Sequence, residues 1–132
     1  MISALFSLLF ILTPHSSQPP GDARLNQEFD VRVGERVTIK KEGLKIALVK
    51  IEEDSRCPEG VQCIWAGNGK VLLRLSRGRE RATTMTLNTG IDPGSAAYGA
   101  YDVKLVNLCP YPKKDVEIKK NEYIATLLVS RR

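Results

Sequence analysis

The residues best suited to chemistry in this sequence are concentrated in one short stretch, residues 53–69. It contains two cysteines, Cys57 and Cys63, separated by five residues that include a proline and a glycine. This separation differs from the CxxC spacing of redox dithiols and zinc knuckles. If the chain is exported, the direct interpretation is a disulfide bond that closes a small loop over residues 57–63.

Five further side chains of this stretch are candidates for a binding site: Asp54, Arg56, Glu59, Trp65 and Asn68. A structural interpretation also accounts for each of them. The aspartate can accept backbone N–H groups at the loop mouth. The arginine can form a surface ion pair with Asp54 or Glu59, and the asparagine fits a tight Asn-Gly turn.

The tryptophan of this stretch has a predicted orientation. Because side chains alternate along a strand, Cys63 and Trp65 share one face and Ile64 and Ala66 take the other. The indole is therefore expected to lie partly buried, against the disulfide or the core, as a tryptophan does in immunoglobulin domains. If it is exposed instead, recognition of a partner is the alternative role.

The chain offers few groups for catalysis. Its one histidine, His15, lies in a segment expected to be removed, which excludes the common catalytic triads and histidine-ligated zinc from the rest. Acid–base chemistry would need carboxylates to converge, and the sequence gives no sign that they do. The carboxylates in question are Asp54, Glu59, Asp92 and Asp102. We therefore expect no enzyme, no metal and no cofactor.

The first 23 residues have the pattern of an export signal and a flexible leader. Residues 4–12 form an uncharged apolar run, which is too short for a membrane span of about 20 residues. A segment rich in proline, serine and glycine follows, and Gly21-Asp22-Ala23 predicts cleavage before Arg24. No lysine or arginine precedes the run, so either the n-region is poor or the true start lies upstream. A buried N-terminal strand or helix is the alternative interpretation. We expect export to the periplasm or outside the cell, with no transmembrane segment.

Residues 24–132 are expected to form one all-β domain. Seven segments have the alternation or β-branched composition of strands, and none has a long helical period. The expected strands are 27–33, 36–40, 44–51, 70–76, 81–88, 101–108 and 122–130. This count favours an antiparallel, immunoglobulin-like β-sandwich, with a small β-barrel as the alternative.

Turn chemistry suggests how the strands are joined. Asn68-Gly69 predicts a two-residue hairpin turn, and Arg77-Gly78 predicts another tight hairpin. The small-residue segment 90–100 is expected to be a mobile surface loop. Cys109, the third cysteine, is interpreted as a buried thiol, with pairing to another chain or within the fold as the alternatives.

The string DSRCP-x(4)-C-x-W-A-G, which begins at Asp54, resembles a segment of a group of small exported bacterial proteins of unknown function. The LxPxP string from Leu108 to Pro112 extends this resemblance. It implies export and a bacterial source, and it implies no particular activity. Cys109 departs from the pattern of the group.

Three functions are compatible with these patterns. The first is an exported, non-enzymatic binding or accessory domain that presents the loop 57–63 and Trp65 to an unknown protein or envelope polymer. The alternatives are a loop-based protease inhibitor and, less favoured, a carboxylate-dependent hydrolase. The net charge of +5 favours anionic surfaces without specificity. Nucleic acid is not expected, because no aromatic platform is interleaved with the basic residues.

Overall fold

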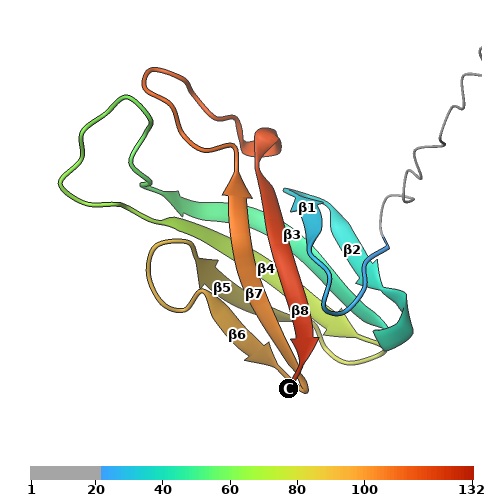
Figure 1. Cartoon of the computed structure of the whole chain (residues 1–132). Helices are drawn as coiled ribbons and strands as arrows, with labels where there is room; N and C mark the ends of the chain where they lie inside the picture. The colour runs from blue at the N-terminus through green and yellow to red at the C-terminus, as the bar shows by residue number, and fades with distance from the viewer. Residues whose placement is uncertain (1–21) are drawn as a thin grey trace, which may run out of the picture.

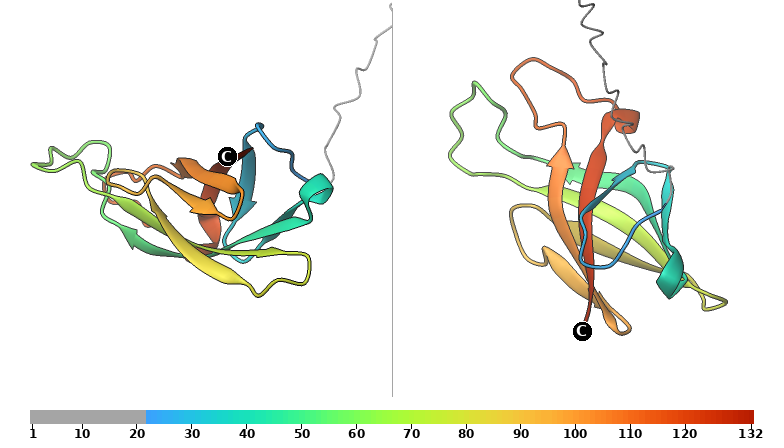
Figure 2. Two further views of the ribbon diagram at one scale, coloured as in Figure 1. Left: turned by 90° about the horizontal axis from the view of Figure 1, so that it is seen from below. Right: turned by 45° about the vertical axis from the view of Figure 1, so that its right-hand side comes forward.

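The computed structural model describes residues 22–132, which form two four-stranded antiparallel sheets packed face to face (Figure 1). Two views in Figure 2 show these sheets as separate layers, most clearly on the left. The eight strands are β1 (Phe29–Arg32), β2 (Arg36–Ile39), β3 (Leu44–Asp54), β4 (Gly69–Arg77), β5 (Thr83–Asn88), β6 (Ser95–Tyr98), β7 (Tyr101–Cys109) and β8 (Ile124–Arg131). Two single-turn 3-10 helices, η1 (Lys40–Glu42) and η2 (Lys120–Glu122), complete the described part.

The sheets have the strand orders β1-β8-β7-β6 and β2-β3-β4-β5. Both sheets are open, so the predicted sandwich is confirmed and the barrel alternative is wrong. Immunoglobulin domains interleave strands A, B, E and D in one sheet and C, F and G in the other. Here each sheet is built mainly from chain neighbours, so the likeness to immunoglobulin domains lies in the two layers and not in the strand order.

The core lies between the sheets and is filled by the alternating residues of the predicted strands. On β8 and just before it, every second side chain is buried, as the alternation predicts. The same holds for β4, for β3 as far as Leu48 and for β7 as far as Leu105, after which a register shift interrupts the alternation. The fully buried side chains include Val31, Leu44, Ile46, Leu48, Val71, Leu73, Leu75, Leu87, Val103, Ala125, Leu127 and Val129.

An eighth strand corrects the prediction that residues 90–100 form a loop. Ser95–Tyr98 is β6, which pairs with the first residues of β7 through a turn at Gly99 and Ala100. Ala96 and Tyr98 pack against the core. Two alanines carry no β-branched or alternating signal, so the pairing with β7 and the packing of Tyr98 stabilise a strand that local composition does not predict.

The hairpin turn predicted at Asn68-Gly69 is also wrong. Gly69 is the first residue of β4, and neither residue has the positive φ that this type of turn requires. The link between β3 and β4 is instead the whole segment 55–68. It projects at one end of the sandwich beside the link between β7 and β8, residues 110–123 (Figure 1). We call these two segments the β3–β4 loop and the β7–β8 loop.

Most of the predicted leader lies outside the described residues. Its last residue, Ala23, is buried, and its backbone N–H donates to the carbonyl oxygen of Thr38 at 3.0 Å. Asp22 forms an ion pair with Lys40 at 3.0 Å. The cleavage position before Arg24 stays a prediction. Residues 22–132 include no helix with the length and apolar character that a membrane span requires.

Candidate functional site

The base of the β3–β4 loop is organised around Arg56, whose exposed fraction is 8%. Its guanidinium binds Asp54 through two hydrogen bonds, from Nε to Oδ1 at 2.7 Å and from Nη2 to Oδ2 at 2.9 Å. Nη1 donates to the carbonyl oxygen of Leu108 at 2.6 Å, and Nη2 also donates to that of Pro110 at 2.9 Å. The pairing with Asp54 is confirmed, but the prediction of a surface ion pair is wrong. The arginine is a buried cross-link between two segments more than 50 residues apart in sequence.

Asp54 has a third partner, which sequence reasoning missed. The Tyr123 hydroxyl donates to Asp54 Oδ2 at 2.7 Å. Burial acts to raise the pKa of Asp54, but the hydrogen bonds from Arg56 and Tyr123 outweigh it, so the pKa lies below its ordinary value. Burial and the adjacent carboxylate raise the pKa of Tyr123 to about 12. Asp54 is thus an ionised carboxylate at neutral pH, which makes it a poor proton donor.

Asn68, at the other end of the loop, is 4% exposed and joins the loop to the β5–β6 connection. Its Nδ2 donates to Asn88 Oδ1 at 2.9 Å, and its Oδ1 accepts the Gly90 N–H at 3.0 Å. Asn88 in turn donates from Nδ2 to the carbonyl oxygen of Pro93 at 3.2 Å. The side-chain amides of both asparagines therefore supply hydrogen-bond partners for polar groups of a turn-rich segment.

Between these two anchors the loop begins as an extension of the β3–β4 ladder. The Ser55 N–H donates to the Asn68 carbonyl at 2.7 Å, and the Cys57 N–H donates to the Ala66 carbonyl at 3.1 Å. Gly67 permits this approach, because a Cβ there would lie 1.8 Å from the Ser55 carbonyl oxygen. These residues form a stem, which we define as 55–57 with 66–68.

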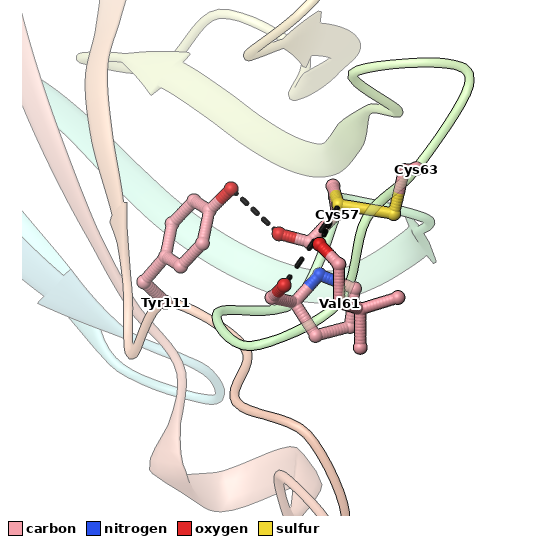
Figure 3. The surroundings of a disulfide bond; sticks show 5 residues. Cys57, Val61, Cys63 and Tyr111 are labelled. Carbon is pink, nitrogen blue, oxygen red and sulfur yellow. Dashed lines mark hydrogen bonds between the residues drawn. A yellow bond between two sulfur atoms is a disulfide. The ribbon is translucent and has the colours of Figure 1, made fainter.

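The disulfide closes the loop at the end of the stem (Figure 3). Cys57 and Cys63 are bonded as predicted, with their Cα atoms 5.9 Å apart. Between them the Val61 N–H donates to the Pro58 carbonyl at 3.2 Å, which makes a tight turn. The Val61 carbonyl oxygen lies 3.3 Å from Cys57 Sγ, a contact without a hydrogen because this sulfur is bonded to its partner.

The β7–β8 loop holds the disulfide loop from the side. The Tyr111 hydroxyl donates to the Cys57 carbonyl oxygen at 2.7 Å (Figure 3). The Glu59 N–H donates to the Pro112 carbonyl at 2.9 Å, and the Lys114 N–H donates to the Glu59 carbonyl at 3.0 Å. Glu59 therefore contributes to this arrangement through its backbone. The two loops form one unit rather than two independent segments.

The apolar residues beyond the stem are exposed. Trp65 is 81% exposed and Ile64 is 93% exposed, and Val61 is partly exposed. We call these three residues the apolar tip. The prediction that Trp65 packs against the disulfide or the core is wrong, because the ladder ends at Cys57 and Ala66 and strand alternation no longer applies at Trp65. An apolar run inside a loop rich in turn formers was the signal that could have indicated exposure.

The carboxylates considered for acid–base chemistry do not all meet at one site. Asp102, at the start of β7, lies 3.4 Å from Arg132, whereas Asp54 lies beside Leu108 near the end of the same strand. Leu108 is six residues beyond Asp102, about 20 Å along β7. Within residues 22–132, no three histidine, cysteine or acidic side chains group as metal ligands would. Cys109 is half-buried and unbonded to another cysteine, and its Sγ accepts a hydrogen bond from Asn107 Nδ2 at 3.1 Å.

No protein family matches the chain, and no curated protein or solved structure matches it either.

Proposed function

We propose that this protein is an exported, non-enzymatic binding domain that contacts a protein partner through the apolar tip. The observation that carries this proposal is the exposure of Trp65 and Ile64, two adjacent large apolar side chains, at the end of a loop that is fixed at its base. Large apolar side chains are normally buried, and exposed groups of them mark interaction sites.

The rigidity of the loop supports this function. Its base is held by the buried Arg56 and Asn68, its middle by the disulfide, and its flank by the bonds to the β7–β8 loop. A binding element that is already ordered loses less conformational entropy when it binds. Four sets of contacts therefore hold the loop that carries the three exposed side chains of the apolar tip.

The composition of the tip favours a protein over an envelope polymer. Tryptophan dominates binding at protein interfaces, and aliphatic neighbours help to exclude water from it. Exposed charged residues of the two loops, Glu59, Lys113, Lys114 and Asp115, would form a polar rim of mixed sign. A polysaccharide would need polar groups beside the indole to bind its hydroxyls, whereas the sequence neighbours of Trp65 are Ile64 and Ala66.

The alternative functions have less support. An inhibitor loop of the substrate-like kind presents extended backbone, whereas the loop 57–63 contains a tight turn from Pro58 to Val61. A hydrolase would need a free carboxylate, whereas Asp54 is saturated by Arg56 and Tyr123. Export rests on the predicted leader and on the disulfide, which persists in oxidising compartments.

The test compares wild type and two variants for the proteins that each of them retains from an envelope extract. Ile64→Ser/Trp65→Ala removes the centre of the tip, and Ile91→Ser removes an exposed isoleucine of the β5–β6 connection as a matched control. We expect wild type and Ile91→Ser to retain the same protein and the double variant to lose it. A partner retained equally by all three proteins would contradict the proposal.

The chain contains one tryptophan, so its fluorescence reports on the tip directly. The free protein should show the emission of a water-exposed indole and strong quenching by acrylamide. Addition of the retained partner should shift the emission to shorter wavelength and protect it from quenching. An unchanged emission in the complex would place the contact elsewhere.

A further inference from the structure

A concave site lies on the outer face of the β2-β3-β4-β5 sheet, far from the apolar tip. It has a volume of about 380 Å³ and is lined by Arg36, Lys45, Ala47, Arg74, Ser76 and Ala82. We call it the basic pocket. Lys45 is near the start of β3 and Asp54 is at its end, which separates the basic pocket from the loop base by roughly 25–30 Å at about 3.4 Å per residue.

The strand register explains why three cations meet here. Ala47 of β3 is paired with Arg36 of β2 on one side and with Arg74 of β4 on the other. Side chains at paired positions point to the same face of a sheet, so the two arginines flank the small side chain of Ala47 with their Cα atoms about 10 Å apart. Lys45 lies two residues before Ala47 on the same face and is paired with Ser76.

The three cations have no counter-charge within residues 22–132. None of Arg36, Lys45 and Arg74 takes part in an ion pair or in a side-chain hydrogen bond there. The acids closest to them in sequence are Glu35, Glu42 and Glu80, and none of these lies within ion-pair distance of the three cations. Like charges that face one another without an acid repel, so an anion between them would relieve this repulsion.

Protection of sheet edges does not account for the basic pocket. Lysine and arginine on edge strands prevent pairing with other chains, and this explanation suits Arg36 on the edge strand β2. Lys45 and Arg74 lie on β3 and β4, which are paired on both sides. Central strands have no free backbone edge, so edge protection does not explain these two residues.

We propose that the basic pocket binds a phosphate group. Arginine presents a planar set of N–H donors that matches the oxygens of a phosphate, and lysine adds a compact positive charge. Ser76 supplies a hydroxyl donor at the same site. The three positive charges of the basic pocket match a doubly charged phosphate better than they match a singly charged carboxylate. This inference is independent of the function proposed for the apolar tip.

The test is a titration of the full domain with inorganic phosphate and, separately, with tripolyphosphate, followed by calorimetry and by backbone amide NMR. Saturable binding should shift the amide signals of Ala47 and Ser76. The variant Arg36→Gln/Lys45→Gln/Arg74→Gln should weaken binding by about tenfold or more, because each charge-assisted hydrogen bond contributes substantially. Its amide spectrum should otherwise match wild type, since these side chains lie on the solvent side of the sheet.

A matched control removes three positive charges elsewhere. Lys113→Gln/Lys114→Gln/Lys119→Gln alters exposed lysines of the β7–β8 loop by the same net charge and should keep wild-type affinity. Tighter binding of tripolyphosphate would identify a phosphate-rich chain as the ligand, and equal binding would identify a single phosphate. Equal losses in both triple variants, or shifts that never saturate, would overturn the proposal.

Discussion

The two ends of the sandwich contain the same chemical arrangement in different surroundings. At the loop end, Asp54 accepts hydrogen bonds from Arg56 and Tyr123. At the opposite end, Glu42 of η1 accepts from Arg131 Nη2 at 2.7 and 2.8 Å and from the Tyr101 hydroxyl at 2.6 Å. In each case one carboxylate joins the β2-β3-β4-β5 side of the sandwich to the other sheet.

The surroundings of the arginines differ. The Arg56 side chain is 6% exposed and that of Arg131 is 64% exposed. Arg56 also donates to the carbonyl oxygens of Leu108 and Pro110, whereas the side-chain hydrogen bonds of Arg131 within the described residues go to Glu42. The two carboxylate–arginine pairs should therefore contribute differently to the free energy of unfolding. A buried group that loses its partner has no water to replace it.

The largest expected effect compares the two arginines directly. Arg56→Met should lower the free energy of unfolding by about 3–5 kcal/mol, since it leaves the Asp54 carboxylate without its counter-charge and two carbonyl groups unpaired in a buried place. Arg131→Met should have a smaller effect, because the Arg131 guanidinium is largely exposed to water and Glu42 keeps the hydrogen bond from Tyr101. Urea unfolding of the two variants measures both values. Equal losses would show that burial does not distinguish the two ends.

The disulfide exists at the loop end alone and should have the next largest effect. Cys57→Ser/Cys63→Ser should cost about 2.4 kcal/mol, the loop-closure entropy of a seven-residue loop. The stem and the bonds to the β7–β8 loop remain, so the variant should still fold. Urea unfolding gives the loss, and acrylamide quenching of Trp65 shows whether the tip becomes more accessible. A reduced, alkylated protein with wild-type stability would contradict this expectation.

Acidic pH should reduce the contributions of Asp54 and Glu42 to stability to different extents. The pKa of Asp54 in the folded protein lies below the ordinary value of 3.8, so its contribution to stability is present above that pH and is lost as the pH falls through the lower pKa. Tyr101, Arg131 and other charges likewise lower the pKa of Glu42.

Asp54→Asn should be less stable than wild type at neutral pH and should lose less stability on acidification to about pH 2. Glu42→Gln should show the same change of slope to a smaller extent, because its partner Arg131 is 64% exposed and water screens that ion pair. Urea unfolding at several pH values provides the slopes. A wild-type slope in Asp54→Asn would mean that its carboxylate has an ordinary pKa.

The smallest effect on stability is expected at the apolar tip. Ile64→Ser/Trp65→Ala should change the free energy of unfolding by less than about 0.5 kcal/mol, since exposed side chains contribute little to the folded state. Thermal and urea unfolding provide the measurement. A loss of 3 kcal/mol or more, typical of a buried aromatic residue, would show that Trp65 is part of the core after all.

Much of the fold could be predicted because strand alternation is a local property. Val71, Leu73 and Leu75 are buried as predicted, and so are Ala125 and Leu127. β6 was missed, since its two alanines and one serine carry no strand signal and its pairing depends on β7. For the segment 53–69, the sequence did not indicate which side chains are buried and which are exposed. Its charged and amide residues are mostly buried in structural bonds, and its apolar residues are the exposed ones.

The sequence by itself determined the inner faces of the strands and the pairing of Cys57 with Cys63. Both depend on residues a few positions apart, and the backbone brings such residues together whatever the rest of the chain does. The tertiary structure alone decided the burial of Arg56 and the exposure of Trp65. The partners of Arg56 lie 52 and 54 residues away, and Tyr123 lies 69 residues from Asp54. A polar loop residue is buried when distant segments cover it, and no local pattern records which segments those are.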